Sequence, residues 1–179
     1  RRQRQMCIRD SNKALVDNQD AVTARLSMAK IYSDVQNQEN GHYNLSFAMK
    51  QLQLLETLNN KDIDRNYDRI QMAISHIYAD KNYEGCDYGK ALSALDKIQS
   101  DEKGFIDLQR GNIYAVENSP YYDMKKAVAC YTSAAQKNNT NAMVKLAKCY
   151  LYGLGVDRDK EAAKLWLQEA DRQGDEYAL

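Results

Sequence analysis

Four cysteines and two histidines are the residues in this sequence most able to bind a metal or to act in catalysis. The cysteines are Cys7, Cys86, Cys130 and Cys149. They are widely spaced, form no C-x-x-C pair and have no histidine at ligand spacing, which argues against a metal site. We therefore expect neither a metal nor another cofactor.

Cys149 allows two interpretations. It directly precedes Tyr150, in a position that isoleucine fills elsewhere in the chain, so it is expected to be a small buried hydrophobic residue. Alternatively, it forms a disulfide with Cys130, because the two lie ten residues before and nine residues after a turn near Thr140 and could be level on antiparallel helices. A bridge would favour an exported protein, whereas free thiols would favour the cytosol.

Neither His42 nor His76 has the neighbours of a catalytic base, since no nucleophile or carboxylate stands beside it in the sequence. His76 is expected on the surface or in a groove. The "GLG" segment at Gly153 lacks the G-K-[ST] of a phosphate loop and is predicted to be a turn. We therefore expect a protein that is not an enzyme.

Three aspartates follow each other at a constant step of 36 residues: Asp87, Asp123 and Asp159. Such a step separates them by about one repeat width, so they are predicted to cap helices rather than to form an acid/base pair. Other residue types share the step, namely the tyrosines Tyr78, Tyr114 and Tyr150, the alanines Ala91, Ala127 and Ala163, and the small residues Ser75, Gly111 and Ala147. A looser copy lies upstream around Tyr32 and Asn44, with a step of 46 residues from Tyr32 to Tyr78. The chain is therefore expected to be a repeat protein.

Each repeat is predicted to be a pair of helices, because apolar residues recur at three- and four-residue steps on either side of a short break. One proline in 179 residues and many good helix formers favour an all-α chain. One pair cannot bury its apolar face alone, so the pairs must stack into a solenoid. We expect an N-terminal helix or cap over residues 1–20, a divergent repeat over 21–69, repeats over 70–105, 106–141 and 142–177, and the start of a further repeat or cap at 178–179, all in one solenoid domain.

The last unit resembles the Sel1-like repeat family, relatives of the tetratricopeptide repeats. The residues that carry the resemblance are Ala142, Leu146, Tyr150, Gly153, Gly155, Val156, Asp159, Ala163, Trp166, Ala170, Gly174 and Ala178. Ala147 stands where the family has glycine, and Asp171 where it has a second alanine. The resemblance implies a right-handed α/α superhelix of antiparallel helix pairs. It also places Ala178 at the start of another first helix, so a further helix, a partner or a crystal neighbour is expected to cover the Trp166 helix.

The first helix of each repeat is expected to line an inner face that holds a partner. The exposed ladder there would consist of Lys30, His76, Asn112 and Lys148, with Gln109 and Lys145 one turn earlier. A polar and lightly basic face suits a peptide or a helix of another protein, and we expect an interaction scaffold or adaptor. The loop tyrosines in "YEGCDY" and "PYYDM" are expected to be solvated, although they could also contact a peptide or a sugar.

The equal numbers of basic and acidic residues, 25 of each, give no electrostatic case for a nucleic-acid partner, and no apolar run is long enough to cross a membrane. The resemblance leaves two alternatives open. One is an exported, periplasmic scaffold that acts in a membrane-associated or secretion complex, as in exopolysaccharide secretion, or binds glycans. The other is an antibiotic-binding or hydrolytic protein like the cysteine-rich relatives. The irregular cysteines and the missing nucleophile–base pair argue against the second.

Overall fold

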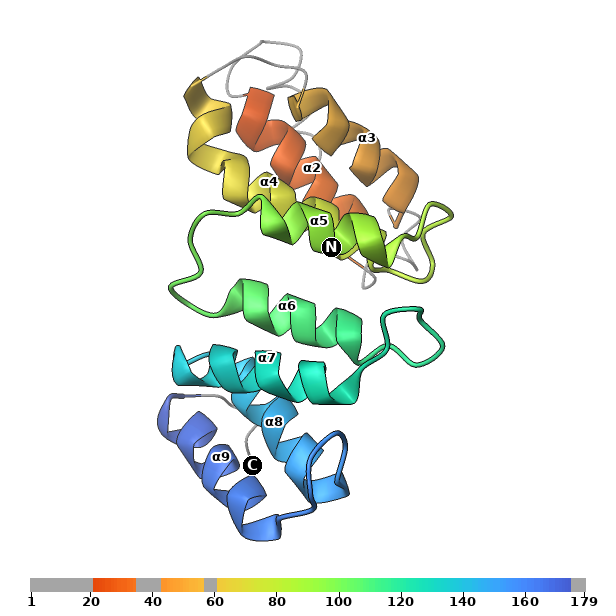
Figure 1. Cartoon of the computed structure of the whole chain (residues 1–179). Coiled ribbons are helices and arrows are strands. Elements are labelled where there is room, and N and C mark those ends of the chain that lie inside the picture. The colour runs from red at the N-terminus through yellow and green to blue at the C-terminus, as the bar shows by residue number, and fades with distance from the viewer. Residues whose placement is uncertain (1–20, 35–42, 57–60, 175–179) are drawn as a thin grey trace. The chain divides into compact units, whose positions relative to one another are not determined.

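The computed structural model describes residues 21–34, 43–56 and 61–174. Within these ranges all regular secondary structure is helical, which confirms the all-α prediction (Figure 1). The predicted N-terminal helix over residues 1–20, the predicted start of a further repeat at 178–179, and His42 lie outside the described residues. No helix of the described part is long and apolar enough to cross a membrane.

The chain divides into two compact units, residues 1–98 and 99–179, and each is described by itself. Unit 1 contains α2 (Ala21–Ser33), α3 (Leu45–Glu56), α4 (Lys61–Tyr78) and α5 (Tyr88–Asp96). Unit 2 contains α6 (Phe105–Tyr114), α7 (Met124–Gln136), α8 (Thr140–Tyr152) and α9 (Lys160–Arg172). The continuity of all repeats in one solenoid domain stays a prediction.

The same pair of contacts closes all four helix pairs. A backbone N–H at the start of the second helix donates to the carbonyl of the recurring tyrosine near the end of the first, in the pairs Asn44–Tyr32 (2.8 Å), Asp87–Tyr78 (2.9 Å), Asp123–Tyr114 (2.8 Å) and Asp159–Tyr150 (2.9 Å). The side chains of these four residues also accept a hydrogen bond from a free N–H of the helix that follows. The predicted capping role of the three aspartates is confirmed, and the upstream copy uses Asn44 in the same way.

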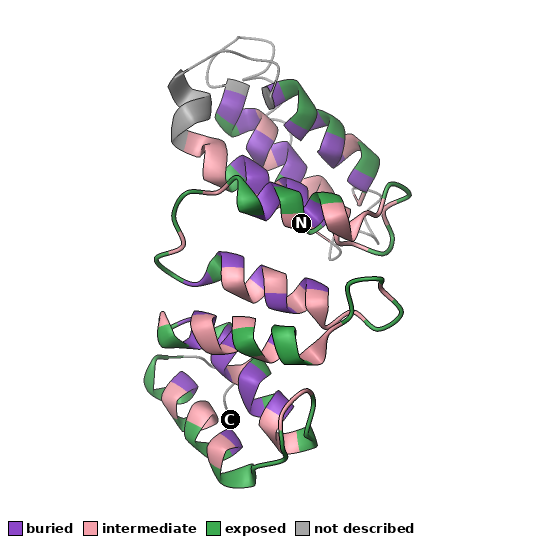
Figure 2. Cartoon of the chain, in the orientation of Figure 1, coloured by how far each residue is buried: buried purple, intermediate pink, exposed green. Residues whose placement is uncertain are grey.

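The core of unit 1 lies between its four helices, where the inward faces are buried (Figure 2). The buried Ala94 of α5 joins the fully buried large side chains of this core, which include Leu52, Leu55, Ile70 and Ile77. Burial of each such side chain contributes about 1.5–3 kcal/mol to folding. These residues come from α3, α4 and α5, so the core holds the helices of two successive pairs together.

The core of unit 2 occupies the same repeat positions with more alanine and with one large aromatic side chain, that of Tyr131. Ala127, Ala134 and Ala142 are fully buried beside Leu146 and Tyr131. The paired helices α6 and α7 approach closely at Gly111, one of the small residues that share the repeat step, where an added Cβ would lie 2.5 Å from the Tyr131 ring. Glycine is therefore required there because of space, not because of its backbone conformation.

Gly111→Ala is expected to lower the free energy of unfolding by about 1–2 kcal/mol, since overpacking costs about 1–3 kcal/mol and the gain in helix propensity returns about 1 kcal/mol. Urea denaturation followed by the fluorescence of Trp166, the chain's one tryptophan, measures this change. Ala147→Gly is the matched control at the same repeat position, and it should destabilise only by the loss of propensity and of one buried methyl group. A more stable Gly111→Ala protein would show that the Tyr131 ring moves aside freely.

Two helix boundaries differ from the sequence prediction. The repeat pattern predicts that "NNKDIDRNYD" connects two repeats, but α4 already begins at Lys61. From Lys61 the chain holds neither glycine nor proline before Tyr78, so nothing there interrupts a helix. The pattern also places Ile98 on the face of a second helix, but α5 ends at Asp96 because the N–H groups of Lys97 and Ile98 turn back to the carbonyls three residues earlier.

Candidate partner-binding surface

The predicted ladder of unit 1 is exposed. Lys30 on α2 and His76 on α4 both reach solvent, from two helices that pack against each other. The pKa of His76 nevertheless lies below its ordinary value, because the surrounding protein reduces the hydration of the charged imidazolium. His76 is therefore largely neutral near pH 7 and can both donate and accept a hydrogen bond.

The ladder of unit 2 is exposed in part. Lys145 and Lys148 are exposed one turn apart on α8. Asn112 on α6 is half-buried, and its Oδ1 accepts a hydrogen bond from the Tyr131 hydroxyl at 3.2 Å. The amide group of Asn112 thus has a fixed orientation, which leaves its Nδ2 as the group available to a partner.

Gln109 is predicted on the exposed face, but it is 9% exposed and belongs to the buried residues of α6. The repeat step places Gln109 on the same helical face as Lys145. The repeat step does not say how deeply that face is buried, and on α6 the side chain at this position is buried. Gln109 is therefore removed from the candidate surface.

The cysteines of the described residues are free thiols. Cys149 is buried, as the isoleucine at its position in other repeats predicts, while Cys130 is half-buried. The structure thus contains no bridge between Cys130 and Cys149. Burial raises the pKa of both thiols, so the reactive thiolate is disfavoured at neutral pH.

The three aspartates at the 36-residue step lie at separate helix starts. Asp87, Asp123 and Asp159 each accept hydrogen bonds at a helix start. The backbone hydrogen bond from Lys126 contributes most to a pKa of Asp123 below the ordinary range. Among residues 21–34, 43–56 and 61–174, no group of three or more His, Cys, Asp or Glu side chains could hold a metal ion.

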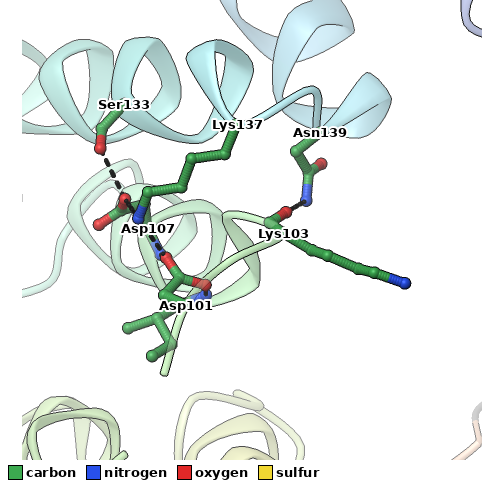
Figure 3. A network of polar contacts seen from close by, with 7 residues as sticks. Asp101, Lys103, Asp107, Ser133, Lys137 and Asn139 are labelled. Atoms are coloured by element: carbon green, nitrogen blue, oxygen red, sulfur yellow. Dashed lines mark hydrogen bonds and ion pairs between the residues drawn. The ribbon is translucent and has the colours of Figure 1, made fainter. Parts of the chain in front are cut away.

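A cluster of polar side chains joins α6, α7 and the start of α8 (Figure 3). Lys137 donates from Nζ to Asp101 at 2.9 Å and to Asp107 at 2.7 Å, and the Ser133 hydroxyl donates to Asp107 at 2.6 Å. Asn139 caps α8 and donates to the carbonyl of Lys103 at 2.9 Å. Lys137 is shared by both carboxylates of this cluster, which therefore acts as a structural clasp. The repeat pattern does not indicate it, because the residues at this repeat position differ in type, with Asp101, Lys137 and Gln173 following each other at the 36-residue step.

The loop tyrosines divide into two groups. Tyr121 and Tyr122, between α6 and α7, are exposed as expected. Tyr83 is half-buried and packs edge-on against the Tyr78 ring, with 5.9 Å between the ring centroids. The expectation of a solvated loop is therefore wrong for Tyr83, which supports the packing of Tyr78.

Comparison with protein families finds the Sel1 repeat at residues 116–139 and 140–175. Residues 116–175 of the chain carry Sel1 repeats. Both matches lie in unit 2, where the sequence resemblance is strongest. Sel1 repeat proteins are generally scaffolds for protein interactions, and they are typically not enzymes.

Solved Sel1-like structures share the fold of the chain. One is a protective antigen of uropathogenic Escherichia coli strains that displays an SLR fold, with a TM-score of 0.61 and 19% identity over 96% of this chain. Another is a Sel1 repeat protein from Oxalobacter formigenes, with a TM-score of 0.58 and 18% identity over 96% of this chain. The chain spans 34% of the length of the first protein and 71% of the second. No curated protein matches the chain.

Unit 1 also contains a pocket that the repeat pattern alone does not predict. Its volume is about 220 Å³, and residues of α3, α4 and α5 line it. Met49, Ile74 and Ala94 form a buried apolar floor, and Lys90 and Lys97 stand at its exposed rim. The sequence does hold a signal for it, because Ala94 occupies the position at which the last Sel1 repeat has Trp166.

Proposed function

We propose that this Sel1 repeat protein is a non-enzymatic scaffold that binds a segment of another protein on the exposed side of its first helices. The observation that carries the proposal is that one repeat position holds an accessible polar side chain in each of the four first helices: Lys30, His76, Asn112 and Lys148. The interior positions next to it, Ile77, Ile113 and Cys149, are buried. The polar residues at this position are therefore not needed for the core.

The chemistry of these side chains points to a partner with carboxylates or backbone carbonyls. Lys145 and Lys148 present two cations one turn apart on α8, and Asn112 adds an amide with a fixed orientation. A helix or an extended peptide with two acidic side chains about one turn apart would meet both lysines. In unit 1, Lys30 and the neutral His76 offer one cation and one mixed donor and acceptor.

Charge reversal on α8 tests the proposal. Peptides selected from a random library on the wild-type chain are measured by calorimetry against the wild type and against Lys145→Glu/Lys148→Glu. We expect the best peptides to be acidic and to lose at least tenfold in affinity to the variant, because two attractions become two repulsions. The attraction should also weaken as salt is added.

Lys125→Glu/Lys164→Glu is the matched control, because it makes the same change of charge at two exposed lysines on α7 and α9. It should change the affinity less than twofold. If both double variants weaken binding equally, net charge alone drives the association, and the first helices are not the binding surface.

A further inference from the structure

The pocket of unit 1 corresponds to a position that unit 2 fills with its own side chain. Each residue that lines the pocket has an equivalent two repeats later, in unit 2. Met49 corresponds to Val128, Ile74 to Leu146, Tyr78 to Tyr150 and Ala94 to Trp166. The two core clusters contain these residues at equivalent places. In unit 2, the half-buried Trp166 packs against the cluster that includes Val128, Leu146 and Tyr150.

Ala94 has no side chain beyond Cβ with which to fill that space. The pocket of about 220 Å³ that Met49, Ile74, Tyr78 and Ala94 help to line is therefore the socket of a repeat tryptophan that unit 1 lacks. Its floor is apolar, and the Tyr78 ring forms part of its wall, so the socket suits an aromatic side chain rather than a charged one.

The rim of the socket is cationic. Lys90, Ser93 and Lys97 follow each other at three- and four-residue steps along α5, and the described residues that line the pocket include no carboxylate. In unit 2 the positions of Ser93 and Lys97 carry Leu165 and Glu169 instead. Lys90 lies 5.5 Å above the Tyr78 ring, and its contact with Asp87 is an exposed pair at 3.8 Å that competes only weakly with another carboxylate.

We propose that this socket binds one aromatic side chain of an acidic segment from a partner protein, with the carboxylates of that segment at Lys90 and Lys97. The apolar floor supplies the burial, and the two lysines select acidic neighbours on either side of the aromatic residue. Ile74 and Tyr78 lie on the opposite side of α4 from His76, since a two-residue step turns a helix by about 200°. The socket is thus a second surface, separate from the ladder of the first helices.

The test uses a fluorescein-labelled peptide with one tryptophan between two runs of three acidic residues. Two counterparts carry alanine in place of the tryptophan, or lysines in place of the acidic residues. Fluorescence anisotropy with the full chain should show at least fivefold tighter binding of the acidic tryptophan peptide than of either counterpart. Equal affinity for the tryptophan and alanine peptides would overturn the proposal.

Two variants locate the binding. Ala94→Trp fills the socket from within, and Lys90→Glu/Lys97→Glu reverses its rim; each should weaken binding at least fivefold. Lys90→Glu/Lys97→Glu changes exposed side chains only, so it still tests whether the peptide binds at the socket if Ala94→Trp does not fold. Lys125→Glu/Lys126→Glu is the control, because Lys126 has the repeat position of Lys90 and the same contacts with a capping aspartate and a tyrosine ring. An equal loss in the control would contradict the assignment.

Two more measurements distinguish the socket from the ladder of the first helices and from a contact between two copies of the chain. Lys145→Glu/Lys148→Glu should leave the ratio of affinities for the tryptophan and alanine peptides unchanged, because those lysines do not line the pocket, so a failure here and a failure of the proposed function are distinguishable. Sedimentation of the peptide-free chain should give the same mass for the wild type and for Lys90→Glu/Lys97→Glu. A dimer that this variant dissociates would identify a second copy as the occupant and overturn the proposal of a partner protein.

Discussion

Gly155→Ala, in the loop between α8 and α9, is expected to lower the free energy of unfolding by about 3 kcal/mol. Gly155 has a φ of +71°, where a Cβ costs about 1 kcal/mol. That Cβ would also lie 2.4 Å from the carbonyl oxygen of Met124 at the start of α7, and overpacking of this kind adds about 1–3 kcal/mol. Because the Met124 carbonyl belongs to the first residue of α7, it cannot move away at low cost. Urea denaturation followed by Trp166 fluorescence measures the change.

Gly153 in the same loop provides the matched control. Its φ is +70°, but an added Cβ would have no heavy atom closer than 3.6 Å. Gly153→Ala should therefore lower the free energy of unfolding only by the cost of a Cβ at positive φ, about 1 kcal/mol. An equal loss of unfolding free energy in the two variants would show that the positive φ alone causes the destabilisation, and that α7 does not constrain the loop.

Lys137→Met is expected to lower the free energy of unfolding by about 2 kcal/mol at pH 7. The substitution keeps the length of the side chain but removes the cation shared by Asp101 and Asp107, which are only 14% and 22% exposed. Hydrogen bonds to charged groups contribute about 1.5–3 kcal/mol each, and the partial exposure of Lys137 reduces their sum. In the variant, the negative charges of Asp101 and Asp107 repel each other with no cation between them.

The effect of Lys137→Met should depend on pH in a defined direction. Burial alone would raise the pKa of Asp107, but hydrogen bonds from Lys137 and Ser133 outweigh it and hold the pKa below its ordinary value. A carboxylate with a lowered pKa stabilises the fold above the unfolded pKa, near pH 4, and loses this contribution as the pH falls through the folded value. The difference between wild type and variant should therefore be full at pH 7 and shrink as the pH drops below about 4.

Lys103→Met is the control for the clasp. Lys103 contributes its backbone carbonyl to the cluster, while its exposed side chain points away from it (Figure 3). This variant should change the stability by less than about 0.5 kcal/mol at every pH. A difference between wild type and Lys137→Met that stays constant from pH 7 to pH 3 would contradict the assignment of the clasp as an ion pair.

Much of the fold can be predicted from the sequence because its helix pairs repeat. A capping residue, a tyrosine and a small residue recur because every helix pair needs the same closing hydrogen bonds and the same close approach, as at Asp123, Tyr114 and Gly111. The predicted boundaries of α4 and α5 are wrong because they lie where the chain leaves the period. There, local signals such as the absence of glycine after Lys61 decide the helix ends.

The candidate surface is less predictable than the fold. The repeat step gives the face on which a side chain lies but not its depth, so Lys148 is exposed as expected while Gln109 is buried. A contact between two residues of unlike type leaves no periodic signal even at one repeat position, and the clasp of Lys137 with Asp101, 36 residues apart, is of this kind. The socket at Ala94 is the opposite case, since alignment of the repeats sets Ala94 at the position of Trp166 and so shows a large side chain replaced by a small one.

An amide NMR titration of the isotopically labelled chain with the tightest library peptide tests the proposed scaffold function most directly. We predict that shifts concentrate on the exposed face of a first helix, at Lys145 and Lys148 with Asn112, or at Lys30 and His76. These shifts should saturate together and disappear in the corresponding charge-reversed variant. Shifts confined to the loops around Tyr121 and Gly153, or to the second helices α7 and α9, would contradict a scaffold that binds through its first helices.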